Sequence, residues 1–285
     1  MALRSPNGTA ARARDRYGTH METVRSRDGT TIAFDRSGRG PSLIIVNGAL
    51  SDRRAVPDLA SRLADELTVI AYDRRGRGDS TDTPPYSVER EIEDLAALID
   101  AAGGSAFVLG HSSGAVLALR AAASGVPIAK LALYEPPLMV DDTRPPIPDD
   151  YVAHLDELVA AGRRGEAVSY FLTTGPLVPP PVIDQMRTSP GWPPMEAMAH
   201  TIPYDARIMD GLMTDDTRPL ARWASVATPT LVLDGGASPP WIRHGASALA
   251  EVLQDASTAT LEGQGHGPAS DVLAPVLLEF FADAS

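Results

Sequence analysis

The sequence predicts an α/β protein with a mostly parallel sheet and helices on both faces. From Glu22 onward, short runs rich in β-branched and aliphatic residues alternate with longer amphipathic runs. This order is typical of βα units. Several short runs, such as SLIIVN at 42–47, are apolar throughout, as expected for strands that are covered on both faces. The 285 residues are enough for one large domain of this kind.

The first half of the chain predicts five strands and three helices. Asp28-Gly29 separates the first two β-rich runs and indicates a hairpin turn. Ser87 can cap a helix that carries an apolar residue on one face at each turn. The expected strands are 22–27, 30–38, 42–47, 67–73 and 106–111, and the expected helices are 55–66, the one after Ser87, and an alanine-rich one that ends at Ala123.

In the second half, a proline-rich segment interrupts the alternation. Strands are expected at 128–135, 228–234 and 256–262, with helices near 243–254 and 271–282. Between them, residues 137–222 hold 13 of the 25 prolines and six of the eight methionines. This segment has helix-like patches at 151–161 and 196–213 and no clear strand. We therefore predict a helical insertion between two strands of one sheet, with a separate small domain as the alternative.

The composition narrows the class of protein. There is no cysteine, which excludes disulfides and thiolate metal sites and favours a reducing, cytoplasmic location. The formal charge of −12 argues against nucleic acid or an anionic membrane as partner. No apolar run reaches the ~18 residues of a membrane span. Residues 1–20 are arginine-rich and end near GTHM, which indicates a cloning-derived extension or a disordered arm.

The segment FVLGHSSGAVLALRAAA contains the strongest chemical signal. Gly110-His111-Ser112-Ser113-Gly114 matches G-x-S-x-G, with a buried strand before it and a helix after it. Such a strand–turn–helix exposes the serine hydroxyl at a helix N-terminus, where the dipole favours developing negative charge. We therefore expect Ser112 to be a nucleophile, with a plain helix-capping serine as the alternative.

The motifs SLIIVNGAL, YDRRGRGDS, GHSSGA, ALYEPP and GQGHG follow one another along the chain. In this order, the chain resembles the α/β-hydrolase family from about residue 22 to 283. The resemblance implies an eight-stranded, mostly parallel sheet with a helical lid inserted after the sixth strand. Residues 137–222 fit the lid, and 21–136 with 223–285 fit the core.

A serine hydroxyl needs a base to take its proton. His266, in the glycine-flanked segment GQGHG after the last strand, is the expected base, because the other histidines lie in the tail, beside the nucleophile or in less suitable settings. One oxyanion donor should be the N–H of Ser113. The resemblance implies that the second is the N–H of Ala49. Asn47 stands where the family has histidine, which leaves the shape of this loop open.

The acid that orients the base is less clear. The usual position, after strand 228–234, holds Ala237 and Ser238. Glu135, followed by two prolines at the end of the preceding strand, resembles the arrangement of some lipases and is the preferred acid. Asp234 is the alternative, although it can instead fold back onto the glycine amides that follow it; a site without an acid is the third possibility. Asp73 is expected to pin its arginine-rich loop.

The expected function is a serine hydrolase that cleaves a small or medium apolar ester, lactone or related carbonyl compound through an acyl-enzyme. Apolar residues of the insertion and its edge are expected to form the substrate wall, or else to attach the insertion to the sheet: Met139, Phe171, Met186, Trp192, Met195, Met198, Tyr204, Met213 and Trp223. No metal or cofactor is expected, and the oligomeric state is open. The alternative function is a cyclase, lyase or ligand-binding protein on the same scaffold, since a fold does not determine function.

Overall fold

The structure is a computed structural model that describes residues 20–282. The predicted tail 1–20 therefore lies almost entirely outside the described residues. The strands are β1 (His20–Arg25), β2 (Thr31–Gly38), β3 (Ser42–Val46), β4 (Thr68–Tyr72), β5 (Ala106–His111), β6 (Ile128–Tyr134), β7 (Thr230–Gly235) and β8 (Ala256–Leu261). The α-helices are α1 (Pro57–Leu63), α2 (Val88–Ala101), α3 (Ser113–Ala123), α4 (Tyr151–Ala160), α5 (Arg164–Thr174), α6 (Pro180–Arg187), α7 (Trp192–Met198), α8 (Ile202–Ile208), α9 (Pro240–Val252) and α10 (Ser270–Ala282).

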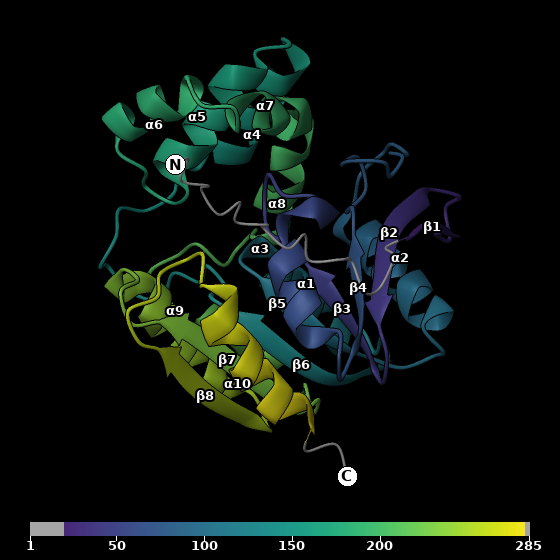
Figure 1. The fold of residues 1–285 in the computed structure, drawn as a ribbon. Coiled ribbons are helices and arrows are strands. Elements are labelled where there is room, and N and C mark those ends of the chain that lie inside the picture. Colours follow the sequence, from purple (N-terminus) through teal and green to yellow (C-terminus); the bar gives the residue numbers. More distant parts are fainter. Residues whose placement is uncertain (1–19, 283–285) are drawn as a thin grey trace, which may run out of the picture.

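The described strands form one eight-stranded sheet in the order β1-β2-β4-β3-β5-β6-β7-β8 (Figure 1). The pairs β1–β2 and β2–β4 are antiparallel, and the others are parallel. The predicted eight-stranded, mostly parallel sheet is confirmed. Because β3, β5, β6 and β7 run in parallel, their carboxyl ends meet at one edge of the sheet, where ligands bind in open α/β sheets.

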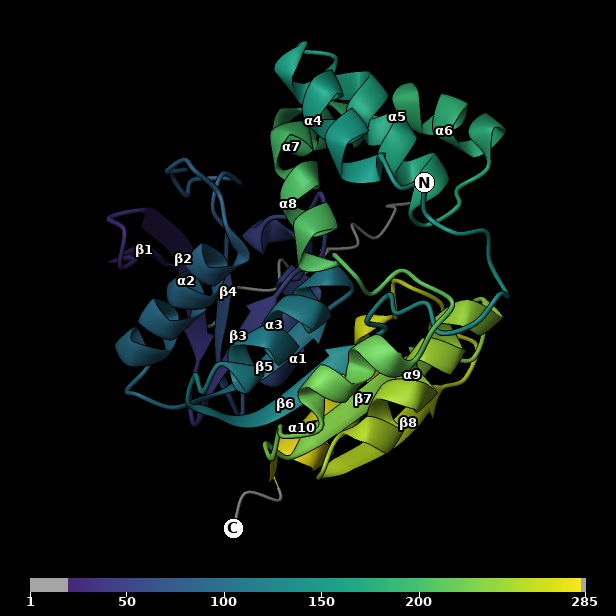
Figure 2. The same cartoon turned by 180° about the vertical axis from the view of Figure 1, so that it is seen from behind.

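Helices cover both faces of the sheet, as the apolar strands predicted. Helices α1 and α10 pack on one face, in front of the sheet in Figure 1. Helices α2, α3 and α9 pack on the other, seen in front in Figure 2. The two faces carry separate apolar cores, one of them built on Ile44 and Val108 and the other on Leu43 and Phe107. These alternating residues point to opposite faces, as the pleat of a strand requires.

Residues between β6 and β7 form a helical insertion that stands above the carboxyl edge of the sheet (Figures 1 and 2). Its helices α4 to α8 enclose an apolar cluster of their own, which includes Leu155, Trp192 and Ile202. The patch predicted at 151–161 is α4, whereas 196–213 holds the end of α7, a 3-10 turn and α8. Helices α5 and α6 were not predicted. Within residues 20–282, no helix is long and apolar enough to cross a membrane.

Candidate active site

Ser112 occupies the sharp turn between β5 and α3. Its backbone is at φ 57° and ψ −129°, a conformation that is strained for a residue with a side chain. Two backbone hydrogen bonds hold this conformation. The Ser112 N–H donates to the Tyr134 carbonyl (3.0 Å), and the Ser112 carbonyl accepts from the Ala115 N–H (2.9 Å). The strand–turn–helix expected of a nucleophile elbow is therefore present.

Glycines make this turn possible because neighbouring backbone occupies the space of a side chain. A Cβ at Gly110 would lie 2.5 Å from the Ala115 Cα, and one at Gly114 would lie 2.2 Å from the Val46 carbonyl oxygen. A Cβ at Gly48 would lie 2.8 Å from the Cβ of Ser112. The loop after β3 is thus packed directly against the serine.

A hydrogen bond joins His266 to Glu135. The His266 Nδ1 and the Glu135 Oε2 are 2.7 Å apart, although 131 residues separate them in sequence. The Glu135 side chain is fully buried, whereas that of His266 is 46% exposed. Burial alone raises the pKa of the Glu135 carboxyl, but hydrogen bonds from His266 and Gly235 outweigh it and hold the pKa below its usual value. Glu135 is therefore ionised at neutral pH.

Backbone geometry at the end of β6 aims this carboxylate. Glu135 has φ 46°, so the chain leaves the strand at this residue. Its N–H still donates to the Leu233 carbonyl (2.9 Å), and its Oε1 accepts from the Gly235 N–H (2.8 Å). One carboxylate oxygen is thus fixed by the neighbouring strand while the other faces the imidazole.

The loop that carries His266 is held by three hydrogen bonds to its carbonyls. The Tyr134 hydroxyl donates to Gly265 (2.6 Å), the Ala237 N–H donates to Gln264 (2.8 Å), and the His111 ring bonds the carbonyl of His266 itself (2.7 Å). A Cβ at Gly235 would lie 2.4 Å from the Gln264 carbonyl oxygen. The first glycine of the Gly235-Gly236 pair is thus needed for this loop to approach.

The His111 Nε2 donates to the His266 carbonyl, so this nitrogen carries the proton when the ring is neutral. Its ring lies 4.8 Å from that of His266 and 5.8 Å from that of Tyr134, centroid to centroid. Burial, together with the nearby His266, lowers the pKa of His111 to about 4. The residue beside the nucleophile is therefore a neutral support for the histidine loop.

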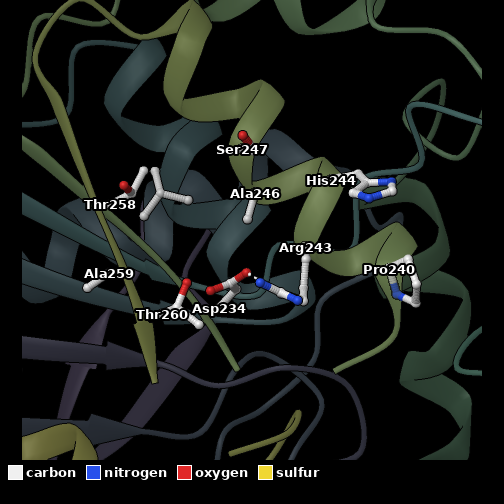
Figure 3. Close-up of a pocket in the computed structure, with 10 residues that line it drawn as sticks. Asp234, Pro240, Arg243, His244, Ala246, Ser247, Thr258, Ala259 and Thr260 are labelled. Atoms are coloured by element: carbon white, nitrogen blue, oxygen red, sulfur yellow. Dashed lines mark hydrogen bonds and ion pairs between the residues drawn. The ribbon is translucent and has the colours of Figure 1, made fainter. Parts of the chain in front are cut away.

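Asp234, the alternative acid, lies elsewhere. Its Oδ2 accepts from the Arg243 Nε at 3.2 Å, and Figure 3 shows the two side chains turned toward each other. They line a pocket of about 440 Å³ between α9 and β8, together with His244, Thr258 and other residues.

The alternative in which Asp234 folds back onto the glycine amides is wrong. The Gly235 N–H donates to Glu135, and the Gly236 N–H donates to the Leu261 carbonyl. Ser238, in the turn after β7, is buried.

The predicted oxyanion residues lie on either side of Ser112. Ser113 is the first residue of α3, where N–H groups have no acceptor within the helix. Ala49 follows Gly48 on the loop that packs against Ser112. Asn47 anchors this loop, since its side-chain amide donates to the Asp52 carbonyl (3.0 Å).

The contacts of Asp73 agree with its expected role of pinning the arginine-rich loop. Its carboxylate is fully buried and accepts from the backbone N–H groups of residues 53 and 79.

The sequence analysis missed a buried charge cluster beside the loop that carries Gly48 and Ala49. Asp205, on α8 of the insertion, accepts from Arg74, Arg77 and the Ser113 hydroxyl. Arg74 also forms two hydrogen bonds with Glu91, both 2.7 Å long. An acidic residue within the predicted helical patch 196–213 and an arginine-rich loop were visible in the sequence, but no local pattern indicates that they pair.

The residues predicted to form an apolar wall divide into two groups. Trp192 belongs to the insertion's apolar cluster, and Phe171, Met186 and Met195 pack against it, as does Leu50 of the loop after β3. The others have contacts of their own. Trp223 lies in the core on one face of the sheet, and Met198 is buried. Tyr204 stacks on Tyr86 and donates to Asp82, and the backbones of Met139 and Met213 form an isolated β-bridge.

Residues 43–276 match the alpha/beta hydrolase family. The chain belongs to this family. The chain is 62% identical in sequence to an alpha/beta hydrolase from Sphaerobacter thermophilus whose crystal structure is known. The two structures align with a TM-score of 0.86, over 91% of this chain and all of that one. Two curated relatives match shorter stretches. Lipase LipV of Mycobacterium tuberculosis is 32% identical over 51% of this chain, and N-formylmaleamate deformylase of Pseudomonas putida is 37% identical over 35%.

The matched stretches span 56% of the lipase and 39% of the deformylase. The family match and the 62% identical hydrolase structure give a hydrolase enzyme as the class of this protein. They leave its nucleophile and substrate to be argued from its own residues.

Proposed function

We propose that this hydrolase is a serine enzyme that cleaves a small or medium-sized apolar ester, lactone or related carbonyl compound through an acyl-enzyme. The observation that carries the proposal is the 2.7 Å pair of His266 and the buried, ionised Glu135 at the sheet edge that also presents Ser112. A carboxylate on Nδ1 fixes the tautomer whose Nε2 can accept a proton from the serine hydroxyl. The same carboxylate stabilises the imidazolium that results.

The reaction follows from these roles. The Ser112 Oγ attacks the carbonyl carbon and transfers its proton to the His266 Nε2. The resulting oxyanion accepts from the N–H groups of Ala49 and Ser113. His266 then protonates the leaving oxygen as its bond to carbon breaks. A water molecule, deprotonated by the same imidazole, attacks the acyl-enzyme, and the returned proton restores Ser112 as the acid leaves.

Substrate preference is inferred from the surroundings of the oxyanion loop. Leu50, directly after Ala49, packs against the insertion's cluster with Phe171 and Trp192. We propose that the partly buried residues on the edge of this cluster, Leu50 and Phe171 among them, contact the acyl or alcohol part of the substrate, with the insertion acting as a lid. The names of the relatives place esters first and N-formyl amides second in a substrate screen.

The test is the variant Ser112→Ala, assayed on chromogenic esters of two to eight carbons. The expected result is a loss of kcat of at least about 10⁴-fold, because the nucleophile is removed from a triad that acts as a unit. The wild-type protein should also react with a fluorophosphonate at Ser112, and mass spectrometry identifies the labelled peptide. Undiminished turnover by Ser112→Ala would refute the proposal.

The alternative, a cyclase, lyase or ligand-binding protein, is motivated in the sequence by the empty acid position and by Asn47. Both features now have a structural counterpart, since Glu135 contacts His266 and Asn47 anchors its loop. Hydrolysis is therefore the stronger proposal. Inertness toward the fluorophosphonate would favour the alternative. A cytoplasmic location stays a prediction.

A further inference from the structure

One side chain of the helical insertion contacts the nucleophile elbow directly. Asp205 of α8 is 2% exposed, and its Oδ1 accepts from the Ser113 hydroxyl at 2.7 Å. Ser113 follows the nucleophile, and its N–H is a proposed oxyanion donor. A hydrogen bond from a hydroxyl to a buried carboxylate is of the stronger, charge-assisted kind. The contact fixes the side chain of this residue from the side of the insertion.

The same carboxylate also reaches the loop of the second proposed donor. The Asp205 Oδ2 accepts from the Arg77 Nη2 (2.5 Å), and the Arg77 Nη1 donates to the Gly48 carbonyl (2.6 Å). The Gly48 carbonyl and the Ala49 N–H belong to one planar, trans peptide and point in opposite directions. Holding the carbonyl toward Arg77 therefore aims the Ala49 N–H to the other side.

Charge balance explains why a carboxylate is needed at this point. Arg74 and Arg77 are both fully buried, and burial together with the neighbouring Arg74 lowers the pKa of Arg77. Asp205 bonds both guanidinium groups, and Glu91 bonds Arg74 from the other side. Removing one carboxylate would leave an unpaired buried cation, which is costly.

Helix α8 is itself fixed to the body of the protein. The Arg77 Nε donates to the Thr201 hydroxyl at 3.1 Å, and the Arg120 Nε donates to the Ile208 carbonyl at 3.0 Å, at the two ends of the helix. The Tyr204 ring stacks on that of Tyr86 at 3.8 Å. Asp205 thus lies on an element whose position relative to the sheet is held from several sides.

We propose that Asp205 is a positioning residue that holds both oxyanion donors, Ser113 and Ala49, in place from the helical insertion. This inference rests on the proposed function and adds to it a residue far from the motifs. It predicts that Asp205 contributes to stabilising the transition state more than to binding the substrate, because the oxyanion forms only during reaction.

The test compares three variants on the ester that the wild-type protein cleaves best. Asp205→Asn should lower kcat by about 10²-fold with KM changed less than about threefold, as expected when reacting groups are displaced. Ser113→Ala keeps the backbone N–H and should lose about tenfold. Asp156→Asn is the matched control, since this carboxylate pairs with Arg207 of the same α8 at the surface, and it should retain wild-type kcat.

A second readout separates positioning from a purely structural task. An alkyl boronic acid forms a tetrahedral adduct on a nucleophilic serine and places an oxygen where the oxyanion develops. Its inhibition constant should rise in Asp205→Asn and Ser113→Ala by a factor similar to the loss of kcat, at temperatures where circular dichroism shows each variant folded. Should Asp205→Asn not fold, Ser113→Ala decides the matter.

The inference is overturned if the folded variants keep wild-type kcat and boronate affinity, or if Asp156→Asn loses as much as Asp205→Asn. These results leave the proposed function intact, because the wild-type protein still turns over ester. A wild-type protein that neither cleaves an ester nor reacts with fluorophosphonate refutes the proposed function, and this inference with it.

Discussion

Glu135 and Asp234 are carboxylates at the ends of neighbouring strands, but they bind different partners. The register pairs Tyr134 of β6 with Leu233 of β7, so Glu135, which directly follows β6, lies next to Asp234 of β7. Glu135 contacts His266 and is fully buried. Asp234 contacts the half-exposed Arg243 of α9, in the pocket of Figure 3. Two acids one strand apart therefore face different surroundings.

The difference comes from backbone conformation as much as from side-chain chemistry. Asp234 continues β7 and keeps the alternation of its strand. Glu135 leaves β6 at a positive φ, and its longer side chain bridges the Gly235 N–H and the imidazole. The contact with His266 therefore comes from a residue that directly follows β6, one strand before the turn after β7 where the sequence analysis expected an acid.

The largest expected effect comes from Glu135→Gln. Glutamine keeps the volume and can still accept from Gly235, but it neither selects the His266 tautomer nor stabilises the imidazolium. We expect kcat to fall by about 10⁴-fold, as in other triads that lose their acid. The measurement is ester turnover of a variant shown to be folded by its thermal unfolding. A loss below tenfold would show that Glu135 is not the acid.

An intermediate effect is expected on stability, from the support of the histidine loop. With a folded-state pKa of about 4 against an ordinary 6.5, His111 takes up a proton more readily in the unfolded chain. Its contribution to stability is complete above pH 6.5 and is lost as the pH falls toward 4. Titration of this residue should lower the free energy of unfolding by at most about 1.4 kcal/mol per pH unit in that window.

The variant His111→Gln tests whether His111 causes this loss of stability at low pH, because glutamine can donate to the His266 carbonyl and does not titrate. Urea unfolding at a series of pH values should give a shallower fall between pH 6.5 and 4 than in the wild-type protein. Identical slopes for the two proteins would assign the acid sensitivity to other groups.

The smallest effect is expected from Asp234→Asn. The variant loses an ion pair whose arginine is 46% exposed, and such pairs contribute about 1 kcal/mol or less. Activity on the same ester should stay within about threefold of wild type. If this variant, and not Glu135→Gln, abolished turnover in a folded protein, the roles assigned to the two carboxylates would have to be exchanged.

Local sequence patterns predicted much of the fold. All eight strands were expected near their observed places, because apolar runs bounded by turn residues are a local signal. Helix α6 was missed since it begins with Pro180-Pro181, which also fits a loop, although proline is well tolerated in the first helical turn. Helix α5 was missed because its buried residues Ala167, Val168 and Leu172 give only a weak apolar face.

By itself, the sequence indicated the turn at Ser112, the glycine-flanked histidine and the succession of strands along the chain. Each of these depends on residues close together in the chain. Only the tertiary structure decided which carboxylate meets His266, and only it revealed Asp205 beside Ser113. The residues of the first contact are 131 positions apart in the sequence, and those of the second are 92 positions apart. A shift of one residue at a strand end redirects a side chain. Such pairings depend on packing between distant elements, which no local pattern encodes.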